Sequence, residues 1–252
     1  MVGVEPQWEG RYFRHTEFTA PNVRSYDANG YASLALAAEV FPLLKVGPKF
    51  WRGFGVTFRY ARAFGFDSDS TRLAAPLRGR SLPVDTDFSR YAVGLRYRIP
   101  LNPDSRTPFV LATSASLCGW NFDFDPELPR GPDLETPTAA YRMIRFGFDG
   151  SFHLRPVTFF MAFHYLHAFS IAAPSSRQLD ELQYPHLPSA VGMGGEIRGA
   201  VGLTIWRWLD LRLSAEYAVL AFHLKPVEGR VDEPARVVDT YVAVGLGPYV
   251  SF

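Results

Sequence analysis

Apolar residues stand at every second position through most of this chain, in segments that are separated by turn-forming stretches. In the last segment, 238–252, Val242, Val244 and Leu246 alternate with small or polar residues. A period of two predicts a β-strand that has one apolar face and one polar or small face. Ten such segments are expected, of which the first is short or imperfect, and they lie at 8–18, 31–40, 54–64, 90–99, 109–124, 144–154, 157–165, 191–205, 211–219 and 238–252.

The fourth segment has the sharpest contrast between its two faces. Tyr91, Val93 and Leu95 occupy one face, and Arg96 and Arg98 occupy the other. If the apolar face contacts lipid, these arginines must point into the interior of a closed wall. Strands of about 9–11 residues are long enough to cross a bilayer at a tilt.

The connections between segments alternate in length. Long polar stretches such as 67–87, 125–137 and 172–190 follow the odd-numbered segments, whereas mostly short turns such as 155–156 and 206–208 follow the even-numbered ones. Outer-membrane barrels have this asymmetry of short periplasmic turns and longer outer loops. The pattern predicts one all-β domain over 1–252, a closed antiparallel up-and-down transmembrane barrel of about ten strands.

A soluble β-sandwich is the main alternative, because it gives the same alternation with the apolar face turned inward. Two features favour the membrane barrel. The second face is rich in Gly and Ala, as a narrow lumen requires, and aromatic residues stand near the ends of the apolar faces, where interfacial girdles form. These aromatic residues are Tyr91, Tyr97, Tyr165, Trp206 and Trp208.

Composition narrows the remaining classes. The chain has 21 Phe, 12 Tyr, 21 Gly and 20 Pro, which suit strands and turns, and a net charge of +1, which does not point to nucleic acid. No apolar run is long enough for a spanning helix. One cysteine, Cys118, allows no intrachain disulfide and no thiolate cluster, and we expect no cofactor. The first residues lack a secretory signal pattern, so we expect the chain to be the mature part with an added Met.

The final segment resembles the last strand of bacterial outer-membrane barrels, because its alternation through Val244, Leu246 and Val250 closes on Phe252. That strand is similar to the signal read by the barrel-insertion machinery. The stretch 88–101, FSRYAVGLRYRIPL, also resembles small Gram-negative barrels of undefined function, especially those of myxobacteria. The resemblance implies the outer membrane as location, with lipid, lipopolysaccharide, the insertion machinery and an envelope protein as partners, and no nucleic acid.

The second faces collect charged residues that we expect to line the lumen. In a small barrel such groups should interlock as a paired network that fills the interior. This set has eight arginines and only five carboxylates. The excess of positive charge leaves a narrow anion-preferring channel as the alternative. The expected network is Glu9, Arg11, Glu39, Arg59, Arg90, Arg96, Arg98, Arg145, Asp149, Glu196, Arg198, Arg212 and Glu216.

Enzymatic constellations are incomplete. Asp67 and Asp69 at the outer end of the third segment are similar to half of an omptin protease site, but His186 has no adjacent Asp pair. His153 and His164 can share the lumen without a further ligand cluster, so no metal site is expected. We therefore expect a non-enzymatic barrel that contacts envelope partners through its loops or side wall, with an anion channel and a rim-located hydrolase as alternatives.

Overall fold

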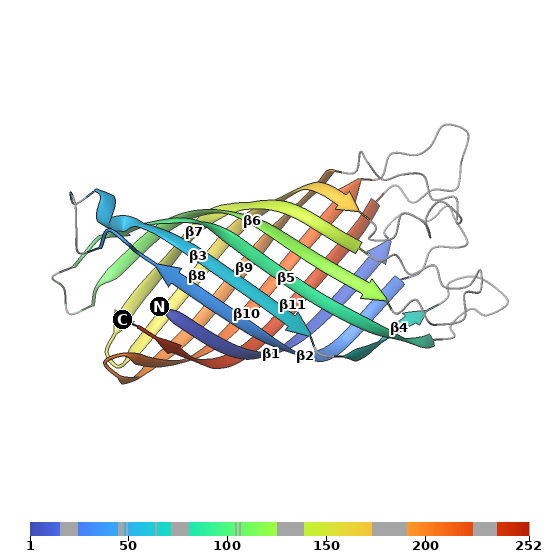
Figure 1. Ribbon diagram of the computed structural model, residues 1–252, viewed down its shortest axis with the longest axis horizontal. Coiled ribbons are helices and arrows are strands. Elements are labelled where there is room, and N and C mark those ends of the chain that lie inside the picture. The colour runs from blue at the N-terminus through green and yellow to red at the C-terminus, as the bar shows by residue number, and fades with distance from the viewer. Residues whose placement is uncertain are drawn as a thin grey trace.

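The computed structural model describes residues 1–15, 25–44, 48, 50–63, 65–71, 81–103, 105, 107–124, 139–172, 191–223 and 236–251. These residues form one antiparallel sheet that closes on itself (Figure 1). A short 3-10 helix, η1 (Trp51–Gly53), precedes β3. The strands are β1 (Val2–His15), β2 (Ser25–Val40), β3 (Phe54–Ala63), β4 (Phe66–Thr71), β5 (Ser81–Pro100), β6 (Phe109–Phe124), β7 (Ala139–Leu154), β8 (Val157–Ala172), β9 (Val191–Trp206), β10 (Leu209–His223) and β11 (Arg236–Val250).

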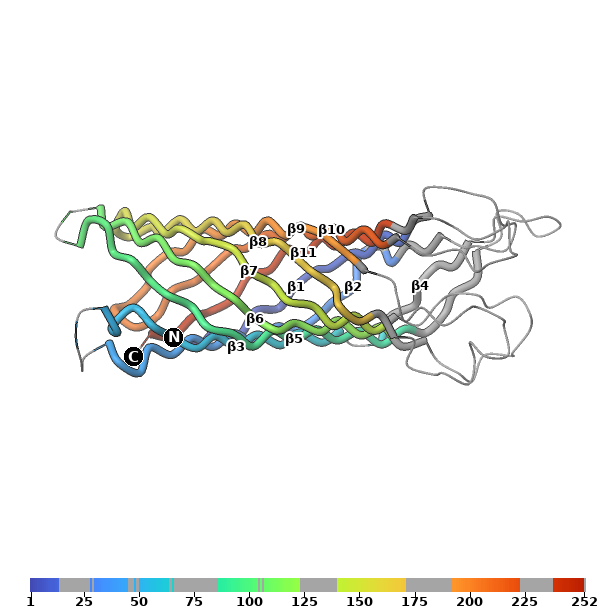
Figure 2. Tube along the Cα trace, turned by 90° about the horizontal axis from the view of Figure 1, so that it is seen from above, coloured from blue at the N-terminus to red at the C-terminus, as the bar shows by residue number. Residues whose placement is uncertain are grey.

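Consecutive strands pair with each other except for β3 and β4, and β1 closes the barrel by pairing with both β2 and β11. The segment β4 continues the line of β3, because it also lies between β2 and β5. The wall therefore has ten strand positions, because β3 and β4 share one of them. The predicted closed up-and-down barrel is confirmed. Figure 2 shows the strands running obliquely around the elongated barrel.

Both termini lie at the end of the barrel that carries the turns 155–156 and 207–208 (Figure 1). We call this the short-turn end, and we call the opposite end, where β1 stops and β2 starts, the long-loop end. The connection asymmetry of outer-membrane barrels assigns the short-turn end to the periplasm.

Two sequence predictions were wrong in extent. The stretch 67–87 is not one long connection, because β4 and β5 continue into it and pair from Phe66 with Thr86 to Thr71 with Ser81. Backbone pairing can continue where polar side chains surround it, so polarity alone did not mark a loop. The first strand is not short: β1 is 14 residues long, and its odd-numbered residues from Gly3 to Phe13 are all buried. The irregularity opposite Glu9 and Arg11 places the extra residue on β2.

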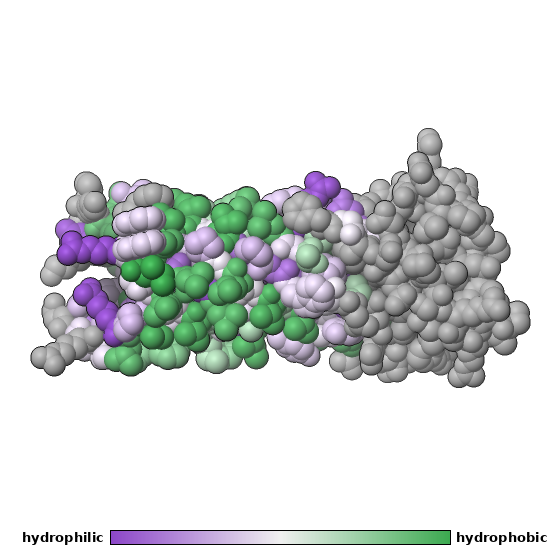
Figure 3. Space-filling model, turned by 90° about the horizontal axis from the view of Figure 1, so that it is seen from below, coloured by the Kyte–Doolittle hydropathy of each residue, from purple (hydrophilic) through white to green (hydrophobic). Residues whose placement is uncertain are grey.

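The apolar face of each strand points outward. Leu95 is 61% exposed and Val93 is 47% exposed, whereas the Arg96 side chain is only 13% exposed. On the face of the barrel that Figure 3 shows, apolar residues form a band that begins near the short-turn end and gives way to paler, more polar residues. Exposed large apolar side chains lie on β1 to β3 and on β5 to β11. A belt of this kind is what hydrocarbon requires of a barrel exterior.

Aromatic residues mark the short-turn edge of this belt. The rings of Trp206 and Trp208 stack at 5.8 Å on either side of a turn, and Tyr97 packs on Phe54 at 4.6 Å. Such amphipathic rings are enriched at membrane interfaces.

Close contact between neighbouring strands depends on glycine at defined points. A Cβ on Gly147 would collide with the carbonyl oxygen of Phe163, and one on Gly194 would collide with that of Val219. Both glycines face the lumen, where the neighbouring strand approaches too closely for a side chain. Glycine within a strand often marks such a close approach of another backbone.

Candidate functional site in the barrel lumen

The lumen toward the long-loop end is filled by an apolar and aromatic layer, which we call the aromatic layer. The rings of Phe88 and Phe122 stack at 4.2 Å, and Trp120 meets Tyr241 edge to face at 4.3 Å. These rings come from β5, β6 and β11 and touch across the interior. The layer consists of Phe13, Ala28, Tyr31, Ala63, Phe88, Ala92, Cys118, Trp120, Phe122, Tyr141, Met143, Leu166, Ala168, Ala218, Leu220, Phe222 and Tyr241.

One ion pair is embedded in the aromatic layer. Arg11 donates to Asp239 through Nε to Oδ1 at 3.0 Å and through Nη2 to Oδ2 at 2.7 Å. The hydroxyl of Tyr141 donates to Asp239 at 2.9 Å, and the guanidinium carbon of Arg11 lies 3.5 Å from the Phe122 ring centre. Both charged side chains are almost completely buried. A buried charge requires this degree of pairing.

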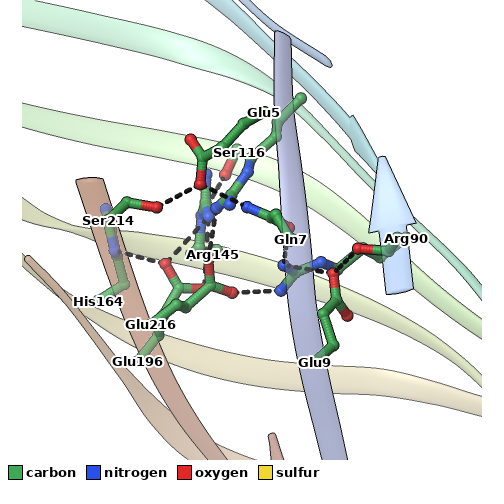
Figure 4. A network of polar contacts seen from close by, with 12 residues as sticks. Glu5, Gln7, Glu9, Arg90, Ser116, Arg145, His164, Glu196, Ser214 and Glu216 are labelled. Carbon is green, nitrogen blue, oxygen red and sulfur yellow. Dashed lines mark hydrogen bonds and ion pairs between the residues drawn. The ribbon is translucent and has the colours of Figure 1, made fainter. Parts of the chain in front are cut away.

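Below the aromatic layer lies an ionic layer, part of which is drawn in Figure 4. Glu216 accepts from Arg59 at 2.5 Å and also from Arg90. Arg90 in addition donates to Gln7 at 3.1 Å and to Glu9 at 3.2 Å. Strands β1, β3, β5 and β10 are thus tied together across the interior.

Glu196 is the centre of a second group in the ionic layer. It accepts from Arg145 at 3.2 Å, and its Oε1 lies 3.1 Å from His164 Nδ1. His164 Nε2 is 3.3 Å from the Ser114 hydroxyl, so serine, histidine and carboxylate contact one another in series. The cavity that adjoins Glu196 has a volume of about 20 Å³ and is lined by neither Ser114 nor His164. Such a volume holds about one water, not a substrate.

Nearer the short-turn end, Arg96 bridges Glu39 and Asp149, and Arg98 donates to Glu39 at 2.6 Å. Arg212 lies 3.5 Å from Asp210, which is a weak pair at the mouth of the barrel.

The structure places all thirteen side chains of the expected network on the lumen side of the wall, and twelve of them form ion pairs within the described residues. Arg198 is the exception. His153 also faces the lumen, where its ring nitrogens lie 3.3 Å from Ser151 and 3.1 Å from Thr158.

Sequence reasoning missed three lumen carboxylates, Glu5, Asp210 and Asp239, and with them the expected excess of arginine was wrong. Continuing the period of two backward from Glu9 and from Tyr241 would have found Glu5 and Asp239. Among residues whose side chains are described, eight arginines (11, 59, 90, 96, 98, 145, 198 and 212) now face eight carboxylates (5, 9, 39, 149, 196, 210, 216 and 239).

The other predicted residues lie elsewhere. Val244 and Leu246 of the predicted insertion signal face outward and are 46% and 52% exposed, Val250 pairs with Val2, and Phe252 lies outside the described residues. In β4, Asp67 pairs with Asp85 and Asp69 with Pro83 in register, and His186 also lies outside the described residues.

The described residues contain no group of three or more His, Cys, Asp or Glu that could hold a metal ion. Nor do they contain a helix that is long and apolar enough to cross a membrane, a finding that does not bear on spanning by strands.

Comparison with known proteins supports the fold. No family model matches the chain, and no curated protein matches it. Among solved structures, the chain is similar to the outer membrane protease OmpT of Escherichia coli, at 9% identity and a TM-score of 0.52, over 99% of this chain and 95% of that one. It also matches the transport unit of the autotransporter AIDA-I of Escherichia coli, at 9% identity and a TM-score of 0.46, over 100% and 90% of the two chains.

The chain is an integral outer-membrane β-barrel. Its apolar belt, its closed wall and its fold agree on this, and the predicted location in the bacterial outer membrane follows from them. A further match, OprG of Pseudomonas aeruginosa, has 8% identity and a TM-score of 0.40, over 100% of this chain and 95% of that one. Identities this low show the fold alone. The resemblance to myxobacterial barrels, and contact with the insertion machinery through the last strand, stay predictions.

Proposed function

We propose that this barrel is a non-conducting and non-enzymatic support that holds its long-loop end at the cell surface for contact with an envelope partner. The observation that carries the proposal is the double filling of the lumen. The aromatic layer and the ionic layer lie one above the other, and an ion crossing the barrel would have to displace both.

Energetics favour a support over a channel. Removing one member of a buried ion pair costs about 3–5 kcal/mol. Both layers include contacts across the interior between strands that are not neighbours in the wall, such as Arg90 with Glu216 and Trp120 with Tyr241. The network therefore fixes the barrel shape. The equal numbers of lumen arginines and carboxylates also remove the charge excess that had favoured an anion-preferring channel.

Reconstitution in planar bilayers tests the proposal. The folded form is recognised on a denaturing gel, because its migration shifts after heating. This form should give no current steps above lipid leakage in 1 M KCl. A water-filled porin reconstituted in parallel should conduct under the same conditions. Regular current steps from the folded form would overturn the proposal, and a preference for chloride in those steps would favour the channel alternative.

A second candidate is a hydrolase at the rim, which would use Asp67 and Asp69. What favours it is the structural similarity to a protein described as an outer membrane protease. The test is peptide cleavage by the folded barrel and by the double variant Asp67→Ala/Asp69→Ala. Cleavage by the wild type that the double variant loses would establish the hydrolase and refute the non-enzymatic role. Equal cleavage by the two proteins, or cleavage by neither, would exclude a hydrolase that uses Asp67 and Asp69.

A further inference from the structure

Arg198 is the one lumen arginine without an ion pair among the described residues. The other seven each lie within 4 Å of a carboxylate. Arg198 lies on β9 and faces the lumen, and its Nε is buried without a hydrogen-bond partner in the described part of the chain. Arg59 is a like-charged neighbour.

The carboxylates nearest to Arg198 are already engaged. Glu216 is its register partner on β10, and the two Glu216 oxygens accept from Arg90 and Arg59. Glu5 accepts through Oε1 from Gln7 at 2.8 Å and from Ser214, and through Oε2 from Tyr249 at 2.6 Å. The Arg198 guanidinium thus lies among anions that other donors hold.

Small and large residues alternate between Arg198 and the short-turn end, where Phe160 is the β8 partner of Ala200 and the Arg212 side chain packs on Gly202. The next two lumen-facing positions on β9 are Ala200 and Gly202, and Ser214 and Arg212 are their register partners on β10. Arg212 is also weakly neutralised, since its partner Asp210 lies 3.5 Å away. The Arg212 guanidinium stacks at 4.3 Å on the Tyr249 ring. Two under-neutralised guanidinium groups therefore stand in sequence behind the periplasmic mouth.

An unpaired charge in a low-dielectric interior is costly, so this position favours an anion from solution. We propose that Arg198, with Arg212 on the mouth side, binds a small oxyanion, a phosphate or a carboxylate, that enters from the periplasmic end. The planar guanidinium fork matches the geometry of these two anions. The site does not depend on the proposed role as a support, because it lies on the periplasmic side of the aromatic layer.

The test uses inorganic phosphate as the probe and the whole folded barrel in detergent. The unfolding midpoint is followed by the gel shift on heating, in phosphate and in chloride at equal ionic strength and pH. Phosphate should raise the wild-type midpoint saturably by about 2–4 °C, a shift typical of about 1 kcal/mol at this chain length. The variant Arg198→Met should lose this dependence, and Arg62→Met, which alters an exposed pair on the outer wall, should keep it.

A second readout separates binding from a general salt effect. Equilibrium dialysis with radiolabelled phosphate should find one bound phosphate per wild-type barrel and none for Arg198→Met. In chloride the variant should be at least as stable as wild type, because it removes a charge that has no partner. An equal phosphate shift in wild type and Arg198→Met, or no shift in either, would overturn the proposal in favour of water bridging Arg198 to Glu5.

Discussion

Arg11 and Asp239 form a buried, two-point ion pair across the seam at which the first and last strands close the barrel. Asp239 is the register partner of Phe13, two residues beyond Arg11 on the lumen side of β1. The pair therefore links the two ends of the chain inside the aromatic layer. Closure of the sheet and filling of the lumen depend on the same contact.

Substituting Asp239→Asn should destabilise the barrel by about 3–5 kcal/mol, because Arg11 remains buried without its counter-charge. Urea unfolding followed by tryptophan fluorescence measures the loss. The matched control is Asp87→Asn, which breaks the exposed Arg62–Asp87 pair and should cost less than about 1 kcal/mol. Equal losses in the two variants would show that the seam pair is not buried as described.

Glu216→Gln should lower stability by a similar amount, since it removes the charge that Arg59 and Arg90 share. The variant should still give no current in planar bilayers, because the aromatic layer above it is unchanged. Ser116→Ala is a suitable control, because it removes no charge and deletes only the hydroxyl that accepts from Arg145 at 3.0 Å, a hydrogen bond worth about 1.5–3 kcal/mol. Current from Glu216→Gln would mean that the ionic layer alone seals the lumen.

Adjacent glycines on β9 should respond differently to a methyl group. Gly194→Ala should cost about 1–3 kcal/mol or prevent folding, because its Cβ would collide with the Val219 carbonyl. At Gly195 the nearest atom to an added Cβ is the His164 carbonyl oxygen at 3.8 Å, so Gly195→Ala should change stability by less than about 0.5 kcal/mol. The yield of heat-modifiable barrel and the urea midpoint report both effects. A tolerated Gly194→Ala would contradict the close approach of β10 at this point.

A charge on the outer wall should be costly according to its depth in the bilayer. Leu95→Arg, midway along the apolar face of β5, should lose about 2–4 kcal/mol in lipid. Met193→Arg should lose only about 0–1 kcal/mol, because Met193 lies near the long-loop end of β9, where it pairs with His167. A charge near the membrane interface costs less than one at the middle of the bilayer. Both residues are more than half exposed, so neither change creates a cavity. Similar losses at the two positions would argue against the assigned belt.

Alternation along each strand was enough to predict the barrel and the direction of most side chains. Tyr91, Val93 and Leu95 point outward while Arg96 points inward, because a period of two fixes the faces once one of them meets lipid. It could not tell that Trp120 and Tyr241 meet in the lumen, since that contact depends on strand tilt and on pairing between β1 and β11. Aromatic rings inside the wall and at its interfaces look alike in a sequence.

The ionic partners were hidden for the same reason. Glu216 bonds Arg59 and Arg90, which are more than 120 residues away in the chain. Nothing local to Arg198 distinguishes it from these paired arginines. Its isolation follows from which donors reach Glu5 and Glu216, and only the assembled lumen decides that.

The most direct test of this account is the accessibility of a spin label at residue 95 in lipid. The label is attached to Leu95→Cys in a Cys118→Ser background, and Met193→Cys serves as the comparison. We predict that residue 95 is highly accessible to oxygen and poorly accessible to a water-soluble nickel chelate, whereas residue 193 is accessible to the chelate. High chelate accessibility at residue 95, with low oxygen accessibility, would place this face in water and contradict the membrane barrel.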